Sequence, residues 1–344
     1  MSAKFLESFG SKLAEQWVAT LLTPAFVFWA GGATAGLQRF GWEPASTWFS
    51  QRGEPLQIAL LVGVFCLIIA SAFVVQRFDL PVLRFLEGYW SRCLLPLRRC
   101  LIARETKHSQ RISDRWQTLK RLDKQSQKFA TLNFLQLPED QQKKEVIYFI
   151  LQQHNQLHSN EKRLQKLTNQ GLKQRLDKLC SEIKDELIQL DWEQHHRPLD
   201  NQLMPTRLGN ILRAAEQRPL EKYGLDAIVC WSRLWLLLSD AVKKDLQEAR
   251  ADLNTAVRIW LWSLLFIVWT IWVWWAAPVG IICAIFAYYY WAIDAARNYG
   301  ELIDATFDLH RHLLYQSLRW YLPPEPDKER LAGKSLTEYL WRGF

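Results

Sequence analysis

Histidine pairs are the first residues in this sequence whose type and spacing could do chemistry. His154 and His158 are four residues apart, so on a helix both imidazoles would lie on one face. A zinc site needs a third ligand and usually a carboxylate behind the imidazoles, whereas the residues around this pair are mostly polar and rich in Gln. His195 and His196 lie in a predicted loop, with a metal or catalytic role as the alternative. We therefore expect no metal ion and no cofactor.

A second candidate is the segment of residues 197–226, which contains most of the turn-forming residues between the apolar regions. Pro205 suits the first turn of a helix, which we predict to run to Glu216. The N–H groups at a helix start can bind an anion such as phosphate, with a structural turn as the alternative. The side chains that form this candidate contact surface for a ligand or a cytoplasmic protein partner are Arg207, Asn210, Arg213 and Tyr223.

Motifs of common catalytic sites do not occur in the chain. The sequence contains no G-x-S-x-G, no Walker A loop, no G-x-G-x-x-G and no H-E-x-x-H. We therefore predict that the protein is not an enzyme. An enzyme that acts on lipid at the membrane surface is the alternative.

Part of the segment described above resembles other proteins. The stretch MPTRLGNILRAAE, followed by YGLDAIVCWSRL, is similar to a segment of uncharacterised bacterial integral membrane proteins. The similar part covers only residues 204–234. The resemblance implies a location in the bacterial inner (plasma) membrane and no known chemistry.

The elements that must position these residues include four apolar windows, at residues 17–37, 56–75, 256–277 and 279–293. A bilayer core of roughly 30 Å needs about 20 helical residues. The fourth window is short for a span, so a complete crossing and a re-entrant loop both stay open. We predict an all-α, multi-pass membrane protein with four transmembrane helices in two hairpins, at residues 17–75 and 256–293.

Local signals refine these windows. Gly32 and Gly36 form a G-x-x-x-G pattern that offers a helix-packing face in the membrane. Pro278 and Gly280 are expected to break the chain between the third and fourth windows. Residues 1–16 carry large apolar side chains every four positions, which predicts an amphipathic helix lying on the membrane surface.

Positive charge is concentrated after the second window. Residues 76–130 hold 13 Lys and Arg against 5 Asp and Glu, and this excess equals the net charge of +8 of the whole chain. Such a block next to an apolar span suits an anionic membrane face better than nucleic acid, which we do not expect as a partner. The positive-inside rule then places both termini and a helical domain at residues 76–255 in the cytoplasm.

Within that domain, apolar residues at helical spacing predict an amphipathic helix over residues 79–102, bent at Pro96. The alternatives for its apolar face are the membrane surface and packing on the domain itself. The basic residues predicted to contact anionic lipid are Arg84, Arg92, Arg98 and Arg99. A leucine-rich seam over residues 172–190 predicts a helical hairpin or a site for a partner helix.

The last part of the chain, residues 294–344, is predicted to be a cytoplasmic helical tail. The helix after the fourth window should run to Tyr321, and Ser335 and Glu338 form a capping-box pattern for a further helix. That helix docks on its own domain or on a partner. Upstream, Ser239 and Asp240 are expected to begin a helix that runs straight into the third window.

These features lead to one functional expectation and one alternative. The first is a non-enzymatic homo-oligomeric membrane protein that forms a pore or perturbs the membrane under the control of its helical domain. Oligomers are expected because four spans are too few to enclose a wide pore. The alternative is a membrane anchor or receptor that presents the domain to cytoplasmic partners or signals.

Overall fold

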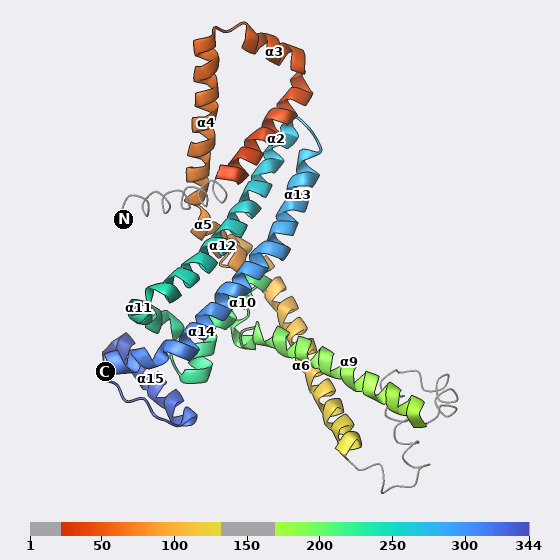
Figure 1. The fold of residues 1–344 in the computed structure, drawn as a ribbon, viewed down its shortest axis with the longest axis vertical. Coiled ribbons are helices and arrows are strands. Elements are labelled where there is room, and N and C mark those ends of the chain that lie inside the picture. Colours follow the sequence, from red (N-terminus) through yellow and green to blue (C-terminus); the bar gives the residue numbers. More distant parts are fainter. Residues whose placement is uncertain (1–21, 132–168, 344) are drawn as a thin grey trace, which may run out of the picture. The chain divides into compact units, whose positions relative to one another are not determined.

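The computed structural model describes residues 22–131 and 169–343, and every element in these ranges is helical (Figure 1). The predicted all-α class is confirmed. The predicted helix over residues 1–16 lies outside the described residues. In chain order the elements are α2 (Thr23–Phe40), α3 (Trp42–Ser50), α4 (Glu54–Gln76), α5 (Asp79–Glu87), η2 (Arg92–Leu94), α6 (Leu95–Thr131), α9 (Asn169–His195), η3 (Asp200–Gln202), α10 (Arg207–Tyr223), α11 (Ala227–Leu237), α12 (Asp240–Leu265), η4 (Phe266–Ile271), α13 (Ala276–Phe286), η5 (Ala287–Ala292), α14 (Ile293–Ser317) and α15 (Pro326–Arg342).

Three helices, rather than the four predicted, are long and apolar enough to cross a membrane among the described residues. They are Glu54–Gln76, Asp240–Ile271 and Ala276–Ser317, and they indicate a membrane-associated protein. The predicted window at residues 17–37 begins outside the described residues. Its described part, α2, contains several small residues and carries Gln38 and Arg39 in its last turn, which makes it less apolar than α4.

The chain divides into two compact units, residues 1–102 with 202–344 and residues 103–201. In the first unit α4 is apolar on all sides, begins with Pro55 in its first turn and leaves most of its side chains exposed. A helix that is apolar all round suits a membrane rather than a surface of a soluble domain. α2 packs against α4, α12 and η4.

The second hairpin turns earlier than the sequence predicts. The helix made by α12 and η4 ends at Ile271, and α13 begins at Ala276 and packs beside α12 (Figure 1). Pro278 lies in the first turn of α13, where its missing N–H costs no hydrogen bond. Gly280 lies inside α13, where an added Cβ would approach the Ser263 carbonyl oxygen of α12 at 2.7 Å. Both residues therefore permit the helix rather than break it.

Helix α13 also continues well beyond the fourth predicted window. It passes through the π-helical turn η5 into α14 and gives one helix, Ala276–Ser317. The window at residues 279–293 is thus the apolar half of a 42-residue helix. The C-terminal half of this helix, α14, is amphipathic and buries residues such as Ile303 and Phe307.

The predicted amphipathic helix over residues 79–102 is wrong as a single element. α5 ends at Glu87 because Gly88 adopts a left-handed conformation, with φ of +98°, that favours glycine. Pro96 is the second residue of α6 and starts that helix instead of bending another. The apolar face of α5 packs on its own unit, where Leu83 and Leu86 are buried.

Helix α10 lies at the centre of the first unit and packs against α5, α14 and α15. It continues past the predicted end at Glu216 to Tyr223, with Pro219 inside the helix. Gly224 caps it in the left-handed region, at φ of +72°. Every residue of α10 from Leu208 to Pro219 is buried or half-buried.

The tail differs from the prediction in where its helices begin and end. α14 ends at Ser317, and α15 runs from Pro326 through the predicted capping box. Ser335 lies inside α15 and donates its hydroxyl to the Leu331 carbonyl oxygen at 3.3 Å. Leu336 is fully buried in a core with residues of α11 and α14, so the last helix docks on its own unit.

The second unit is an antiparallel helical hairpin formed by α6 from residue 103 onward and α9. Its described buried side chains include Ile112 and Leu119 of α6 and Leu179 and Ile183 of α9. Leu179 and Ile183 belong to the predicted leucine seam, so two of its described residues are buried. Leu172 and Leu176 have side chains outside the described part.

Candidate functional site

The start of α10 is the predicted anion-binding position, and two of its first backbone donors have partners within the chain. Thr206 is the N-cap and accepts a hydrogen bond from the Gly209 N–H at 3.0 Å. The Leu208 N–H donates to the Tyr288 hydroxyl oxygen at 3.5 Å. The buried Asn210 side chain accepts from the Met204 N–H at 2.7 Å, which fixes the preceding loop. The geometry fits a structural turn, and a bound anion stays a prediction.

The four predicted contact residues do not form one surface. Arg207 is exposed at the helix start, whereas Arg213 donates to Gln202 at 2.8 Å and to Glu216 at 3.2 Å. Tyr223 lies 16 residues after Arg207, or roughly 24 Å along the helix at 1.5 Å per residue. A single small ligand could not touch both ends.

Tyr223 belongs to a polar network at the far end of α10. Its hydroxyl donates to Asp308 at 2.6 Å, and the guanidinium of Arg311 lies 4.0 Å from the centre of its ring. Burial, followed by the hydrogen bond to Asp308, raises the pKa of Tyr223 to about 12. Arg311 in turn pairs with the buried Glu329 of α15 at 2.6 Å. The network joins α10, α14 and α15.

Close backbone contacts fix α10 against its neighbours. A Cβ at Gly209 would overlap the Glu87 carbonyl oxygen at the end of α5. A Cβ at Gly300 of α14 would lie 3.1 Å from the Ala215 side chain. Glycine at these positions lets α5 and α14 approach α10 more closely than a larger residue would allow.

Two buried ion pairs connect the helices around α10. Arg218 of α10 pairs with Asp304 of α14, and both side chains are only 9% exposed. Arg258 of α12 forms a bidentate ion pair with Asp79, the first residue of α5. Its Nε and Nη2 atoms donate to the two carboxylate oxygens at 3.1 and 2.5 Å. Such pairs hold their helices in register because separating them leaves an uncompensated buried charge.

Glu87 has the most perturbed carboxyl group near this junction. Burial raises its pKa to about 7, repulsion from Glu216 adds to the rise, and Arg250 and Arg84 oppose it. Burial likewise raises the pKa of Tyr89, again with a contribution from Glu216. This carboxyl therefore changes its charge near neutral pH at the point where α5 meets α10.

The predicted lipid-contacting arginines lie on three different elements. Arg84 is in α5, Arg92 in η2, and Arg98 and Arg99 are in the first turns of α6. All except the half-buried Arg98 are exposed. Their contact with anionic lipid stays a prediction.

Gly32 and Gly36 of α2 face aromatic rings rather than a helix backbone. A Cβ at Gly32 would overlap the Trp269 ring, and one at Gly36 would lie 3.4 Å from Trp272. Gly31, which the sequence pattern did not single out, has the same relation to Phe266. The small residues of α2 thus accommodate the aromatic side chains of η4 and the turn after it.

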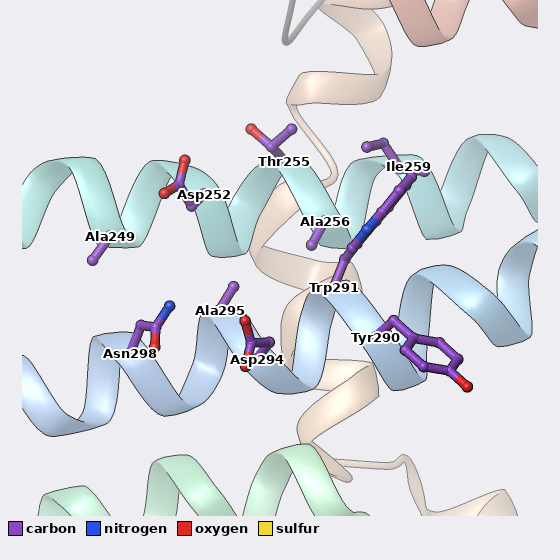
Figure 2. Close-up of a pocket in the computed structure, with 10 residues that line it drawn as sticks. All are labelled: Ala249, Asp252, Thr255, Ala256, Ile259, Tyr290, Trp291, Asp294, Ala295 and Asn298. Carbon is purple, nitrogen blue, oxygen red and sulfur yellow. The ribbon is translucent and has the colours of Figure 1, made fainter.

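A groove lies between α12 and the helix formed by η5 and α14 (Figure 2). Its volume is about 420 Å³. Ala249, Ala256 and Ala295 point into the gap between the two helices, as Figure 2 shows. The side chains around them are polar at one end and apolar or aromatic at the other: Asp252, Thr255, Asp294 and Asn298, and Ile259, Tyr290 and Trp291.

Histidines do not form a metal site in the described part of the chain, where no three potential ligands come together. His196 is buried, its ring centre lies 4.3 Å from that of Trp192 with the two rings tilted, and its Nδ1 atom is 2.8 Å from the Trp192 carbonyl oxygen. His154 and His158 lie outside the described residues.

Sequence reasoning missed the buried ion pairs and the groove. Arg258 and Asp79 had one usable signal, because each lies at the edge of an apolar window and their charges are opposite. Arg218 and Asp304 gave none, since each lies in an ordinary amphipathic pattern. The groove depends on which faces of two helices meet.

Comparisons of the chain with protein-family models, with curated proteins and with solved structures found no match.

Proposed function

We propose that the protein is a non-enzymatic integral membrane protein in which α10 links its membrane-crossing helices to a helical domain in the cytoplasm. The observation that carries this proposal is the continuity of two long helices. Asp240–Ile271 and Ala276–Ser317 each contain an apolar half and a polar half, and the polar halves pack on or near α10. A movement of either helix in the bilayer would therefore reach α10.

The contacts of α10 support rigid transmission. The Arg218–Asp304 pair connects it to α14, and Gly209 brings it into contact with the end of α5, which directly follows α4. The Arg258–Asp79 pair connects α5 to α12. Buried pairs and packed backbones have discrete arrangements, so the helices around α10 should move together.

Bilayer thickness provides a test of this linkage. The full-length protein is placed in nanodiscs of short-chain and of long-chain lipid, and amide hydrogen exchange is measured. We expect the exchange of α10 to change between the two bilayers, because a mismatch tilts or shifts the long helices. The α6–α9 hairpin is the internal reference. Identical exchange of α10 in both bilayers would contradict the proposal.

We further propose that the protein acts as a homo-oligomer in the bacterial plasma membrane, with both termini in the cytoplasm and with a pore formed by several copies. The exposed apolar surface of α4 leaves room for contacts with lipid or with other copies. Native mass spectrometry gives the number of copies, and liposome conductance tests the pore. A monomer in every detergent would exclude the oligomer, and sealed liposomes would exclude the pore.

A membrane anchor or receptor is the second candidate, and the hairpin unit favours it. α9 carries Ile188 and Trp192 with exposed fractions of 66% and 42%, and Leu199 follows with 55%. Ile188 and Trp192 are four residues apart on α9, so these two side chains lie near one face of the helix, and Leu199 follows the end of that helix. Such a face suits a cytoplasmic protein partner. Crosslinking in cells tests it, and crosslinks from this face only to other copies would contradict it.

A further inference from the structure

The groove between α12 and α14 has two chemically different ends (Figure 2). Asp252 and Asp294 come from the two facing helices at the polar end, whereas Ile259 and Trp291 lie at the other. Its volume of about 420 Å³ is within the usual range of small-ligand sites. A ligand that matches the groove is therefore amphipathic.

The charge of the polar end specifies the ligand further. None of the lining residues is basic, although the chain as a whole has a net charge of +8. Asp252 and Asp294 make no hydrogen bond or ion pair with any described residue. Two basic residues of α12 are next to lining residues in the sequence: the Arg250 guanidinium lies over the Tyr299 ring at 5.4 Å, and Arg258 pairs with Asp79. Two carboxylates are thus available to a cation.

The aromatic end adds a second attraction for a cation. The π-helical turn Ala287–Ala292 places Tyr290 and Trp291 consecutively at the groove, and single π turns often occur at functional sites. Trp and Tyr rings attract an ammonium group over their faces. Within the described residues no three metal ligands come together, so an organic cation suits the groove better than a metal ion.

The location of the groove identifies the source of this cation. It lies where both long helices change from polar to apolar sequence, and aromatic residues commonly mark that level at a membrane interface. Phe286, exposed on α13, stacks on Tyr290 with 4.7 Å between ring centres. Apolar surface therefore continues from the groove along the membrane-crossing helix, where an acyl chain could lie.

We propose that this groove binds the ammonium head group of a membrane lipid. Asp252 and Asp294 hold the charged amine, Trp291 covers it, and the acyl chains extend along α13. The proposal requires the helices to lie in a membrane, but it does not depend on the linkage through α10, the oligomer or the pore.

Native mass spectrometry of the full-length protein from nanodiscs tests it. The nanodiscs contain equal amounts of phosphatidylethanolamine, which has an amine, and phosphatidylglycerol, which has none. We expect the wild-type protein to retain phosphatidylethanolamine in preference. The double variant Asp252→Asn and Asp294→Asn should retain about tenfold less of it, because each lost charge-assisted hydrogen bond weakens binding.

The matched control is Asp240→Asn and Asp245→Asn, which removes two exposed carboxylates of α12 outside the groove. It should retain as much phosphatidylethanolamine as the wild type. Equal retention in the groove variant and the wild type would overturn the proposal. So would displacement of the lipid by free ethanolamine as effectively as by short-chain phosphatidylethanolamine, since that result would indicate a soluble amine as the ligand.

Discussion

Ion pairs occur in both compact units of the chain, but their surroundings differ. Around α10, Arg218 and Asp304 are each 9% exposed and join two helices that also touch through small residues. In the hairpin, Arg115 and Glu186 join α6 and α9 at 2.8 Å while 53% and 41% exposed. Buried pairs are costly to break, whereas exposed pairs contribute little. The α10 region should therefore be rigid, and the hairpin should open locally at lower cost.

The buried pair provides the most severe test of this difference. Asp304→Ala removes the carboxylate that pairs with the buried Arg218 guanidinium, and we expect a loss of about 3–5 kcal/mol in the free energy of unfolding. Thermal unfolding of the full chain in detergent measures it. Arg218→Met combined with Asp304→Leu removes both charges and should recover much of the stability. A loss of less than about 1 kcal/mol, roughly the value of an exposed pair, would contradict the proposed difference between the α10 region and the hairpin.

Close packing around α10 gives the next largest effect. Gly209→Ala places a methyl group against the Glu87 carbonyl oxygen, so either α5 or α10 must shift. We expect a loss of about 2–3 kcal/mol, as for other overpacked cores. Gly63→Ala is the matched control, because nothing lies within 4 Å of a Cβ at that position of α4. Equal unfolding temperatures for the two variants would show that α10 has room to move.

Glu87 tests whether the same junction responds to pH. Its pKa is 4.5 in a model peptide and about 7 in the fold, so the unfolded chain loses the proton first and stability falls as the pH rises from 4.5 to 7. Glu87→Gln should abolish this fall and raise stability above pH 7. The full pKa change corresponds to roughly 3 kcal/mol, which partial exposure reduces to about 1–2 kcal/mol.

Unfolding curves across this pH range measure the effect, and two further variants control it. Glu216→Gln removes the repulsion and should lower the pKa of Glu87. Arg250→Gln removes an opposing attraction and should raise it. Arg84, which lies on the same helix and also lowers the pKa of Glu87, is kept in all of these variants. A slope with pH that is the same in Glu87→Gln as in the wild type would assign the pH dependence to another group.

The sequence predicts much of the helical content, because apolar runs and capping residues are local signals. The uncharged run over residues 56–75 corresponds to α4, and the expected helix start at Asp240 is confirmed. Gly224 ends α10, as its position suggests. These features depend on neighbours within a few residues of each other along the chain.

Features that depend on distant contacts could not be predicted in the same way. Pro278 has the same local preference whether it ends a helix or begins one, and the turn at residues 272–275 decides between them. Gly88 ends α5, although the apolar spacing around it continues as if in one helix. The Arg258–Asp79 pair joins residues 179 positions apart, and only tertiary packing brings such residues together. The candidate site therefore required the structure.

The exposed pair of the hairpin should give the smallest effect of all. Arg115 donates to the two carboxylate oxygens of Glu186 at 2.8 and 3.0 Å. Glu186→Gln removes the negative charge and one of these two acceptor oxygens, but water can solvate the guanidinium. We expect a change of about 0.2–1 kcal/mol in the local opening of α6 and α9, measured by amide hydrogen exchange in the full chain. Salt at about 1 M should remove most of it, because the Debye length falls to roughly 3 Å. Should Glu186→Gln open the hairpin as much as Asp304→Ala destabilises α10, exposure would not be what separates the two regions.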